Sequence, residues 1–246
     1  MRRGGDISSG IDKTEEISST VKSKLGVESL AHLTCIGASR ESVRKIAREL
    51  RDMGIENIMA LRGDIPKGES TRPSADFTYA SDLIRELKEF GGFCVGAACY
   101  PEGHIDCDDS FKDLVYLREK QDSGAEFFIT QLFFDNGLFE RFLERARRMG
   151  ITAPISAGVM PIFSRGQIER MIFMCGVSLP SAIVRLLHKY ENDPKSLKQA
   201  GIEYAADQME GLIRGGADGV HIYTMNQPAA AIAAMERCRN LGLRRG

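Results

Sequence analysis

Residues 30–53 read LAHLTCIGASRESVRKIARELRDM, a short apolar run followed by a segment with helical periodicity. The run Leu30–Ile36 has the length and composition of a buried strand. Ser39 can then cap a helix over Glu41–Met53, which Gly54 would end. The apolar residues that share one face of this helix are Val43, Ile46, Ala47 and Leu50. This stretch therefore predicts one strand and one helix that packs on a sheet.

The same alternation of a strand and a helix recurs along the chain. Near-continuous apolar runs are expected of parallel strands, because helices cover both faces of the sheet. We predict six strands, at Leu30–Ile36, Asn57–Arg62, Cys94–Tyr100, Phe127–Phe134, Ile155–Pro161 and Gly219–Met225. The predicted helices are an opening one, with Asp12 and Glu15 in capping-box spacing and Gly26 after its end, Glu41–Met53, Ala80–Phe90, Asp109–Ser123, Leu138–Met149, Arg165–Met174, Pro180–Tyr190, Lys195–Arg214 and Pro228–Leu241.

Two architectures place repeated strand–helix units in one domain: the closed eight-stranded barrel and the open doubly wound sheet. No Gly-x-Gly-x-x-Gly turn follows the first strand, which disfavours a dinucleotide-binding open sheet. The length of 246 residues suits a barrel, although the strand count stops at six. Met171–Val177 could be stretched into a seventh strand, but its neighbours favour a helix. We predict an α/β fold of the (β/α)₈ TIM-barrel family with about six strands, as one domain over residues 1–246.

Composition excludes several classes of partner. The 33 Lys and Arg residues nearly balance the 34 Asp and Glu residues, so no field of one sign attracts nucleic acid or a membrane surface. Apolar runs such as Phe127–Phe134 are too short to cross a bilayer, and we expect a cytoplasmic protein. Six cysteines without a Cys-x-x-Cys pair indicate reduced thiols.

Unusual polar residues cluster at the carboxyl ends of the predicted strands. Each has a structural interpretation on its own: Arg62 and Asp64 could form a surface ion pair, and His32 could be a core histidine. Together they predict one cleft, because α/β enzymes build their sites at these strand ends. Gln131, on an otherwise apolar strand, could hydrogen-bond a flat heterocycle or join two strands. The segments concerned are His32 to Cys35, Leu61 to Asp64, Tyr100 to His104, Thr130 to Gln131 and Tyr223 to Asn226.

Metal chemistry has weak support in the sequence. Cys99, His104 and Cys107 are possible zinc ligands within a short span, but a fourth ligand and the usual cysteine pairing are missing. We therefore predict no metal site. Motifs of serine hydrolases, zinc proteases and P-loop enzymes do not occur.

From about Gly4 to its C-terminus, the chain resembles the methylenetetrahydrofolate reductase family. The similar segments occur in family order and with family-like spacing. They are AHLTC (31–35), ALRGD (60–64), YASDL (79–83), YPEGH (100–104), ITQLFFD (129–135), GVMPI (158–162) and HIYTMN (221–226).

This resemblance implies a barrel that binds FAD, takes hydride from NADH or NADPH and passes it to methylenetetrahydrofolate, giving methyltetrahydrofolate. It implies catalytic roles for Asp64 and Gln131, and substrate binding by Gln131, Tyr223 and Gln227. It also implies a homo-oligomer, and it leaves open an electron-donating partner subunit. The residues that it places at the flavin are His32, Arg62, Gly63, Asp64, Ala80, Tyr100, His104, Asp113 and Lys120.

The chain departs from the family pattern in three places. Gln227 stands where many relatives have an arginine that touches the folate, and Tyr116 and Glu119 replace an asparagine and a basic residue of some relatives. Relatives also begin with a strand that carries a glutamate, the acid that helps to open the folate ring. Met1 falls about where the family's second strand ends, so we expect the first two strands to be missing. The alternatives are a flavin-binding remnant without catalysis and a different barrel enzyme for a pterin or phosphate ligand.

Overall fold

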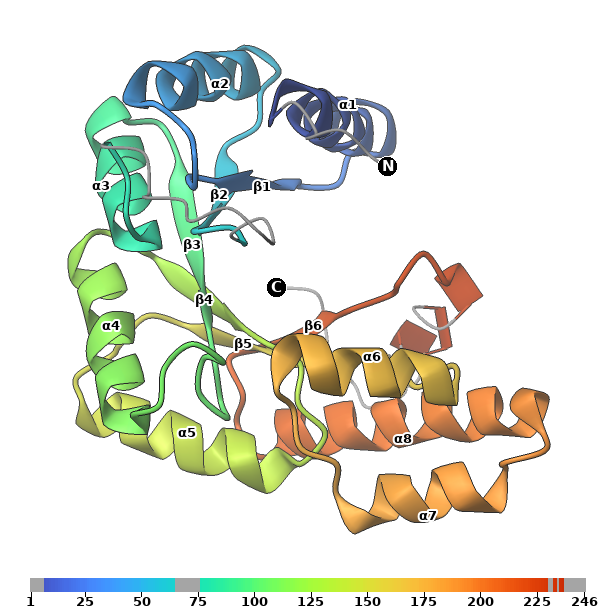
Figure 1. Ribbon diagram of the computed structural model, residues 1–246. Coiled ribbons are helices and arrows are strands. Elements are labelled where there is room, and N and C mark those ends of the chain that lie inside the picture. The colour runs from blue at the N-terminus through green and yellow to red at the C-terminus, as the bar shows by residue number, and fades with distance from the viewer. Residues whose placement is uncertain (1–6, 65–75, 230–231, 234, 237–246) are drawn as a thin grey trace. The chain divides into compact units, whose positions relative to one another are not determined.

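The computed structural model describes residues 7–64, 76–229, 232–233 and 235–236, with side chains described from residue 16 onward (Figure 1). Six strands form one sheet in the order β1-β2-β3-β4-β5-β6, so each strand neighbours its successor in the chain. The strand pairs β1–β2, β2–β3 and β5–β6 are parallel. The strands are β1 (Leu30–Thr34), β2 (Asn57–Leu61), β3 (Cys94–Cys99), β4 (Phe127–Thr130), β5 (Ile155–Val159) and β6 (Gly219–Ile222). The predicted α/β fold with six parallel strands is confirmed.

Eight helices lie between or before these strands in the described residues. They are α1 (Ile7–Leu25), α2 (Arg40–Asp52), α3 (Ala80–Phe90), α4 (Ser110–Asp122), α5 (Asn136–Arg148), α6 (Arg165–Cys175), α7 (Ser181–Lys189) and α8 (Pro194–Arg214). The possible seventh strand at Met171–Val177 is wrong, because most of that segment belongs to α6. In the predicted helix Pro228–Leu241, residues 228–229, 232–233 and 235–236 are helical, and the others lie outside the described residues. The side chains of Asp12 and Glu15 also lie outside them.

The chain divides into two compact units, residues 1–98 with 117–128 and residues 99–116 with 129–246. In the first unit, α2 and α3 pack on each other, and α3 also contacts β2. Ser39 accepts a hydrogen bond from the Ser42 backbone and caps α2 as predicted. The buried residues of α2 are the predicted Val43, Ile46, Ala47 and Leu50.

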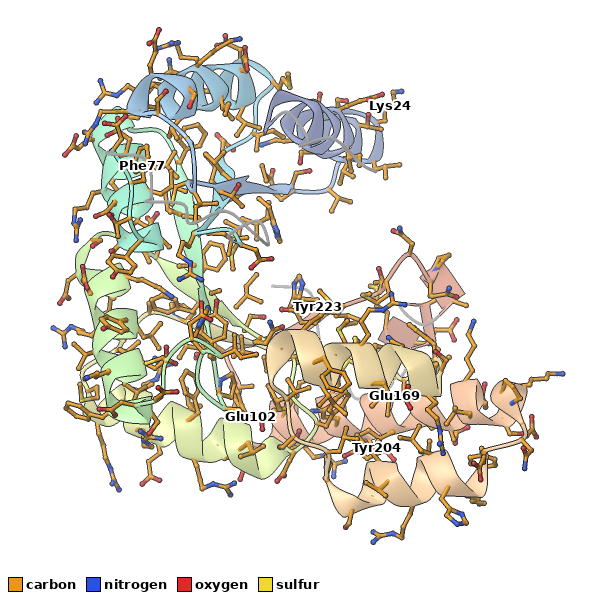
Figure 2. All side chains as sticks on the ribbon, in the orientation of Figure 1. Lys24, Phe77, Glu102, Glu169, Tyr204 and Tyr223 are labelled. Atoms are coloured by element: carbon orange, nitrogen blue, oxygen red, sulfur yellow. The ribbon has the colours of Figure 1, made fainter. Side chains whose placement is uncertain are left out.

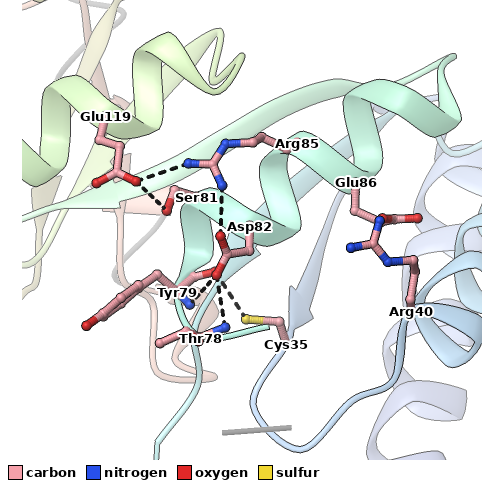
Figure 3. Close-up of polar contacts among 9 residues, drawn as sticks. All are labelled: Cys35, Arg40, Thr78, Tyr79, Ser81, Asp82, Arg85, Glu86 and Glu119. Carbon is pink, nitrogen blue, oxygen red and sulfur yellow. Dashed lines mark hydrogen bonds and ion pairs between the residues drawn. The ribbon is translucent and has the colours of Figure 1, made fainter. Parts of the chain in front are cut away.

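A buried carboxylate joins α2 and α3 in this unit. Glu86 of α3 is 2% exposed and forms ion pairs with Arg40, at 2.6 Å, and with Arg44 of α2. Figure 3 shows Arg40 and Glu86 facing each other between these helices. A buried charge of this kind needs its partners, so the α2–α3 contact depends on the two arginines.

In the second unit, α8 contacts α5, α7, β5 and β6 (Figure 1). Gly201 of α8 permits close approach, because a Cβ atom there would lie 2.0 Å from the carbonyl oxygen of Ile162. The Tyr204 hydroxyl donates to the carbonyl oxygen of Phe134 at 2.7 Å, and the Gln208 amide donates to that of Phe133 at 2.9 Å. Tyr204 is labelled in Figure 2. One face of α8 thus anchors the segments after β4 and β5.

These contacts explain why the predicted strands run past the observed carboxyl ends. β4 ends at Thr130 and not at Phe134, because the carbonyl groups of Phe133 and Phe134 bond side chains of α8 and no neighbouring strand. β6 ends before Met225 and Asn226, whose φ angles of 49° and 57° are incompatible with a strand. After β4 the apolar pattern continues because Leu132, Phe133 and Phe134 are buried in the loop.

Candidate functional site

The turn after β2 carries Arg62, Gly63 and Asp64. Two hydrogen bonds beyond the strands hold it: Cys35 N donates to Leu61 O at 3.1 Å, and Ile36 N donates to Arg62 O at 2.8 Å. Gly63 has a φ angle of 88°, and a Cβ atom there would lie 2.9 Å from Cγ2 of Ile36. Both the angle and the contact require glycine. Arg62 is partly buried, whereas the Asp64 side chain is exposed.

The Cys35 thiol links this turn to the start of α3. Its sulfur lies 3.8 Å from Arg62 O and 3.6 Å from Tyr79 O. Burial, chiefly, raises the pKa of Cys35 to about 11, so the thiol stays protonated and can donate. Tyr79 directly precedes Ala80, the flavin residue that the resemblance implies. Sequence analysis missed this role, although the place of Cys35 directly after β1 was a usable signal.

Polar contacts also fix the first turn of α3 (Figure 3). The Asp82 carboxylate accepts hydrogen bonds from the backbone of Thr78 and Tyr79, both at 2.9 Å, and pairs with Arg85 at 2.8 Å. Burial alone would raise the pKa of Asp82, but the two backbone donors and Arg85 together lower it. Arg85 also reaches Glu119 of α4 at 3.0 Å. Glu119, which stands where some relatives have a basic residue, thus forms an ion pair with Arg85.

Two further predicted flavin residues belong to the same unit. Lys120 of α4 donates from Nζ to the carbonyl oxygen of Ala98 near the end of β3, at 2.8 Å. His32 is exposed on β1, while Ala31 and Leu33 on the opposite face are buried. His32 is therefore not a core histidine, and its ring is accessible to a ligand.

In the second unit, the segment after β3 borders a cavity of about 250 Å³. The carboxyl oxygen Oε2 of Glu102 accepts from Ser178 N at 3.0 Å, and its Oε1 is buried without a hydrogen-bond partner. The Arg145 guanidinium bonds the hydroxyl of Ser110 at 3.1 Å. The residues that line the cavity are Tyr100, Pro101, Glu102, Gly103, Ser110, Asp113, Leu114, Leu138, Phe142 and Arg145.

This cavity brings together two predicted flavin residues, Tyr100 and Asp113. His104 lies beside it, with its ring edge-on to that of Tyr100 at a centroid distance of 4.6 Å. Arg145 was missed by sequence analysis, because it looks like one of several basic residues at the end of α5. No group of three or more potential ligands gathers to hold a metal in the part of the chain that the structure describes, and the expectation of no metal stays a prediction.

The end of β4 packs closely against β5 and Tyr223. The Tyr223 hydroxyl donates to Thr130 O at 2.8 Å, and Gly158 N donates to Thr130 Oγ1 at 2.8 Å. A Cβ atom on Gly158 would lie 2.7 Å from the Tyr223 ring, so the ring packs on bare backbone. Burial raises the pKa of Tyr223 and keeps it a donor. The hydroxyl hydrogen of Tyr223 is thus committed to Thr130 O.

Gln131 and Gln227, the other predicted substrate residues, are both held through their side-chain oxygens. Leu132 N donates to Oε1 of Gln131 at 3.0 Å. Lys198 Nζ donates to Oε1 of Gln227 at 3.1 Å and lies 5.5 Å from the centroid of the Phe163 ring. Lys198 was not among the residues predicted from the sequence.

No helix within the described ranges is long and apolar enough to cross a bilayer.

Known proteins resemble this chain over nearly its whole length. The family model described as methylenetetrahydrofolate reductase matches residues 4–239. The 5,10-methylenetetrahydrofolate reductase of Pectobacterium carotovorum is 38% identical over 95% of this chain and 76% of its own length. The Escherichia coli enzyme of that name is 36% identical, over 96% of this chain and 77% of its own length. Methylenetetrahydrofolate reductase (NADH) 1 of Arabidopsis thaliana is 33% identical, over 94% of this chain and 41% of its own length.

Among solved structures, an uncharacterised Clostridium thermocellum protein that binds two copies of 5-methyl-5,6,7,8-tetrahydrofolic acid has a TM-score of 0.59. The match covers 97% of this chain and 92% of that protein at 12% identity, a level that supports the fold alone. The family model and the identities of more than 30% to the bacterial enzymes support more than the fold. The chain belongs to the methylenetetrahydrofolate reductase family.

Proposed function

We propose that this protein reduces 5,10-methylenetetrahydrofolate to 5-methyltetrahydrofolate, with hydride from NADH or NADPH relayed by bound FAD. The observation that carries the proposal is the 38% identity, over 95% of the chain, to an enzyme named for this reaction. Fold alone would not be enough, because barrels of this class support many chemistries. The residues at the strand ends supply the chemical argument.

The turn after β2 fits a large anionic cofactor. Gly63 has no side chain and holds the turn in a positive-φ conformation, while the space that a Cβ atom would occupy is filled by Ile36 and Thr34. Arg62 offers a cation beside it, suited to a phosphate. In this unit we assign flavin contacts to His32, Arg62, Gly63, Asp64, Ala80 and Lys120.

The cavity in the second unit would hold one part of the cofactor. Its volume of about 250 Å³ is below the roughly 300–1,000 Å³ of sites that enclose a drug-sized ligand. The Asp113 carboxylate can accept from a ribose hydroxyl, and the Arg145 guanidinium suits a phosphate. We assign Tyr100, His104 and Asp113 to flavin binding here.

FAD, when bound, supplies the redox chemistry by accepting hydride from the nicotinamide and delivering it to the folate. Asp64 contributes charge: an exposed carboxylate at the turn would favour a cationic form of the folate. Attraction between opposite charges at about 4 Å is on the order of 4 kcal/mol at an effective dielectric constant of about 20. Gln131 would orient the pterin or the nicotinamide. Leu132 N holds its side-chain oxygen, and its NH₂ group can donate to the ligand.

The test uses the purified chain reconstituted with FAD under anaerobic conditions. NADH and NADPH are titrated separately while the visible flavin absorbance is followed. We expect one nucleotide to bleach the flavin and methylenetetrahydrofolate to restore its colour. At saturating FAD, Asp64→Asn should slow the recovery by about tenfold or more, as loss of a transition-state charge contact does. Asp52→Asn, at an exposed position at the end of α2, is the matched control.

Three results would contradict the proposal or part of it. Failure to bind FAD would exclude the flavin site. Bleaching without recovery on addition of folate would favour the alternative, a flavin-binding protein that does not reduce folate. Equal recovery rates for Asp64→Asn and the wild type would remove Asp64 from the mechanism.

A further inference from the structure

We propose that Lys198 binds the carboxylate tail of the folate substrate, an inference that rests on the proposed function. The Lys198 ammonium lies 3.1 Å from Oε1 of Gln227 and 5.5 Å from the centroid of the Phe163 ring. An ammonium, an amide and an aromatic ring thus meet in one place. All three side chains are partly exposed, so a ligand can reach them.

The fold holds this cluster at the ligand-binding end of the sheet. Phe163 follows β5, which ends at Val159, and Gln227 follows β6, which ends at Ile222. Because β5 and β6 are parallel neighbours, their carboxyl ends meet at one edge. That edge is where barrel enzymes bind their ligands.

Lys198 is held there by the packing of α8. Gly201, one turn further along the helix, packs against the carbonyl oxygen of Ile162, the residue before Phe163. Lys198 and Gly201 lie on the same face, because residues three apart on a helix are neighbours. A larger residue at Gly201 would push the helix, and Lys198 with it, away from Phe163. This packing fixes the backbone at Lys198, and the Gln227 oxygen holds its ammonium.

The charge of this lysine calls for an anionic partner. No carboxylate forms an ion pair with Lys198 among the residues that the structure describes, and the ammonium donates to the neutral Gln227 amide. Gln227 accepts from Lys198 through its oxygen, which leaves the hydrogens of its NH₂ group able to donate. Two donors beside an aromatic ring match a ligand that joins an aromatic ring to carboxylates. The aminobenzoylglutamate tail of folate has this chemistry.

The experiment measures binding to the FAD-reconstituted protein, independently of turnover. The ligands are 5-methyltetrahydrofolate and a tetrahydropterin that lacks the aminobenzoylglutamate tail. Lys198→Met should weaken folate binding about tenfold, or about 1.4 kcal/mol, as loss of a charge-assisted hydrogen bond does. Binding of the pterin should not change. Lys195→Met removes the same charge from an exposed position on the same helix and should affect neither ligand.

Lys198→Arg keeps the charge and should restore folate binding to within about threefold of the wild type. The contribution of Lys198 should also shrink at high salt, because charge pairs are screened there. Equal weakening of both ligands by Lys198→Met would mean that the lysine only holds the helix in place, and would overturn the proposal. Weakened NADH or NADPH binding with unchanged folate binding would also overturn it. If the wild type binds folate but Lys198→Met binds it equally well, this inference alone fails. If the wild type binds neither ligand, the proposed function fails first.

Discussion

The Cys35 sulfur lies 3.6 Å from the carbonyl oxygen of Tyr79, and this contact joins the end of the first strand to the start of α3. The same sulfur lies 3.8 Å from the carbonyl oxygen of Arg62. One buried thiol therefore touches the two segments that carry Arg62, Gly63 and Ala80. These contacts stabilise the positions of residues that we assign to flavin binding.

Cys35 should make the stability of the protein sensitive to alkaline pH. Its pKa rises from an ordinary 9.0 to about 11, so its contribution is complete below about pH 9 and is lost as the pH rises to about 11. We expect unfolding by urea to show a loss of up to about 2 kcal/mol over this window, and a smaller loss in Cys35→Ala. Identical pH profiles of the two proteins would show that the thiolate is tolerated in the fold.

Gly63→Ala should reduce FAD affinity beyond the effect of backbone strain. Alanine at a positive φ costs roughly 1–2 kcal/mol, and here its Cβ also meets Ile36 at 2.9 Å. Gly54→Ala is a matched control, because Gly54 has a φ angle of 75° with no atom near the added carbon. Both variants should lose stability, but only Gly63→Ala should bind FAD more weakly. Equal FAD affinities would place the cofactor away from this turn.

Gly201→Ala should destabilise the second unit, although alanine normally favours a helix. Its Cβ would lie 2.0 Å from Ile162 O, so we expect a loss of about 1–3 kcal/mol from overpacking. Gly166→Ala in α6 meets no atom within 4 Å and should be neutral or slightly stabilising. Thermal unfolding of both variants checks this. A stable Gly201→Ala protein would mean that α8 can move off Ile162 without cost.

Removal of the two partners of Glu86 should cost more than removal of Glu86 itself. Arg40→Met with Arg44→Met leaves a carboxylate that is 2% exposed without its cations, at a cost of about 3–5 kcal/mol. Glu86→Gln leaves two arginines that are 52% and 44% exposed and can turn to water. Arg48→Met, exposed on the same helix, should change little. The reverse order in urea unfolding would contradict this account.

Local patterns predicted the secondary structure because their causes lie within a few residues. Ser39 and the stripe from Val43 to Leu50 form a capped amphipathic helix by spacing alone. The carboxyl ends of the strands were misplaced because α8 binds the carbonyls of Phe133 and Phe134 from far along the chain. No sequence pattern in or near β4 predicts those hydrogen-bond partners. The apolar pattern therefore predicts which residues are buried, but it does not predict the residue at which the strand ends.

The candidate site was predictable only in part, for a similar reason. Arg62, Gly63, Tyr100 and Gln131 follow strands directly, so their order in the sequence indicates the strand ends. Lys198 is 29 residues away from Gln227 and lies in the second turn of α8, where no sequence pattern distinguishes it from the other polar residues of the helix. Its role depends on how closely α8 packs, which is a property of the folded chain. Long-range partners are thus the part of the site that sequence patterns miss.

The measurement that tests the central claim most directly is a single turnover with the natural substrate. The FAD-reconstituted protein is first reduced anaerobically by NADH or NADPH and freed of excess nucleotide. It is then mixed with methylenetetrahydrofolate, and the folate product is identified by chromatography. Our account predicts flavin reoxidation together with an equal amount of 5-methyltetrahydrofolate. A protein that stays reduced, or that reoxidises without forming this product, would contradict it.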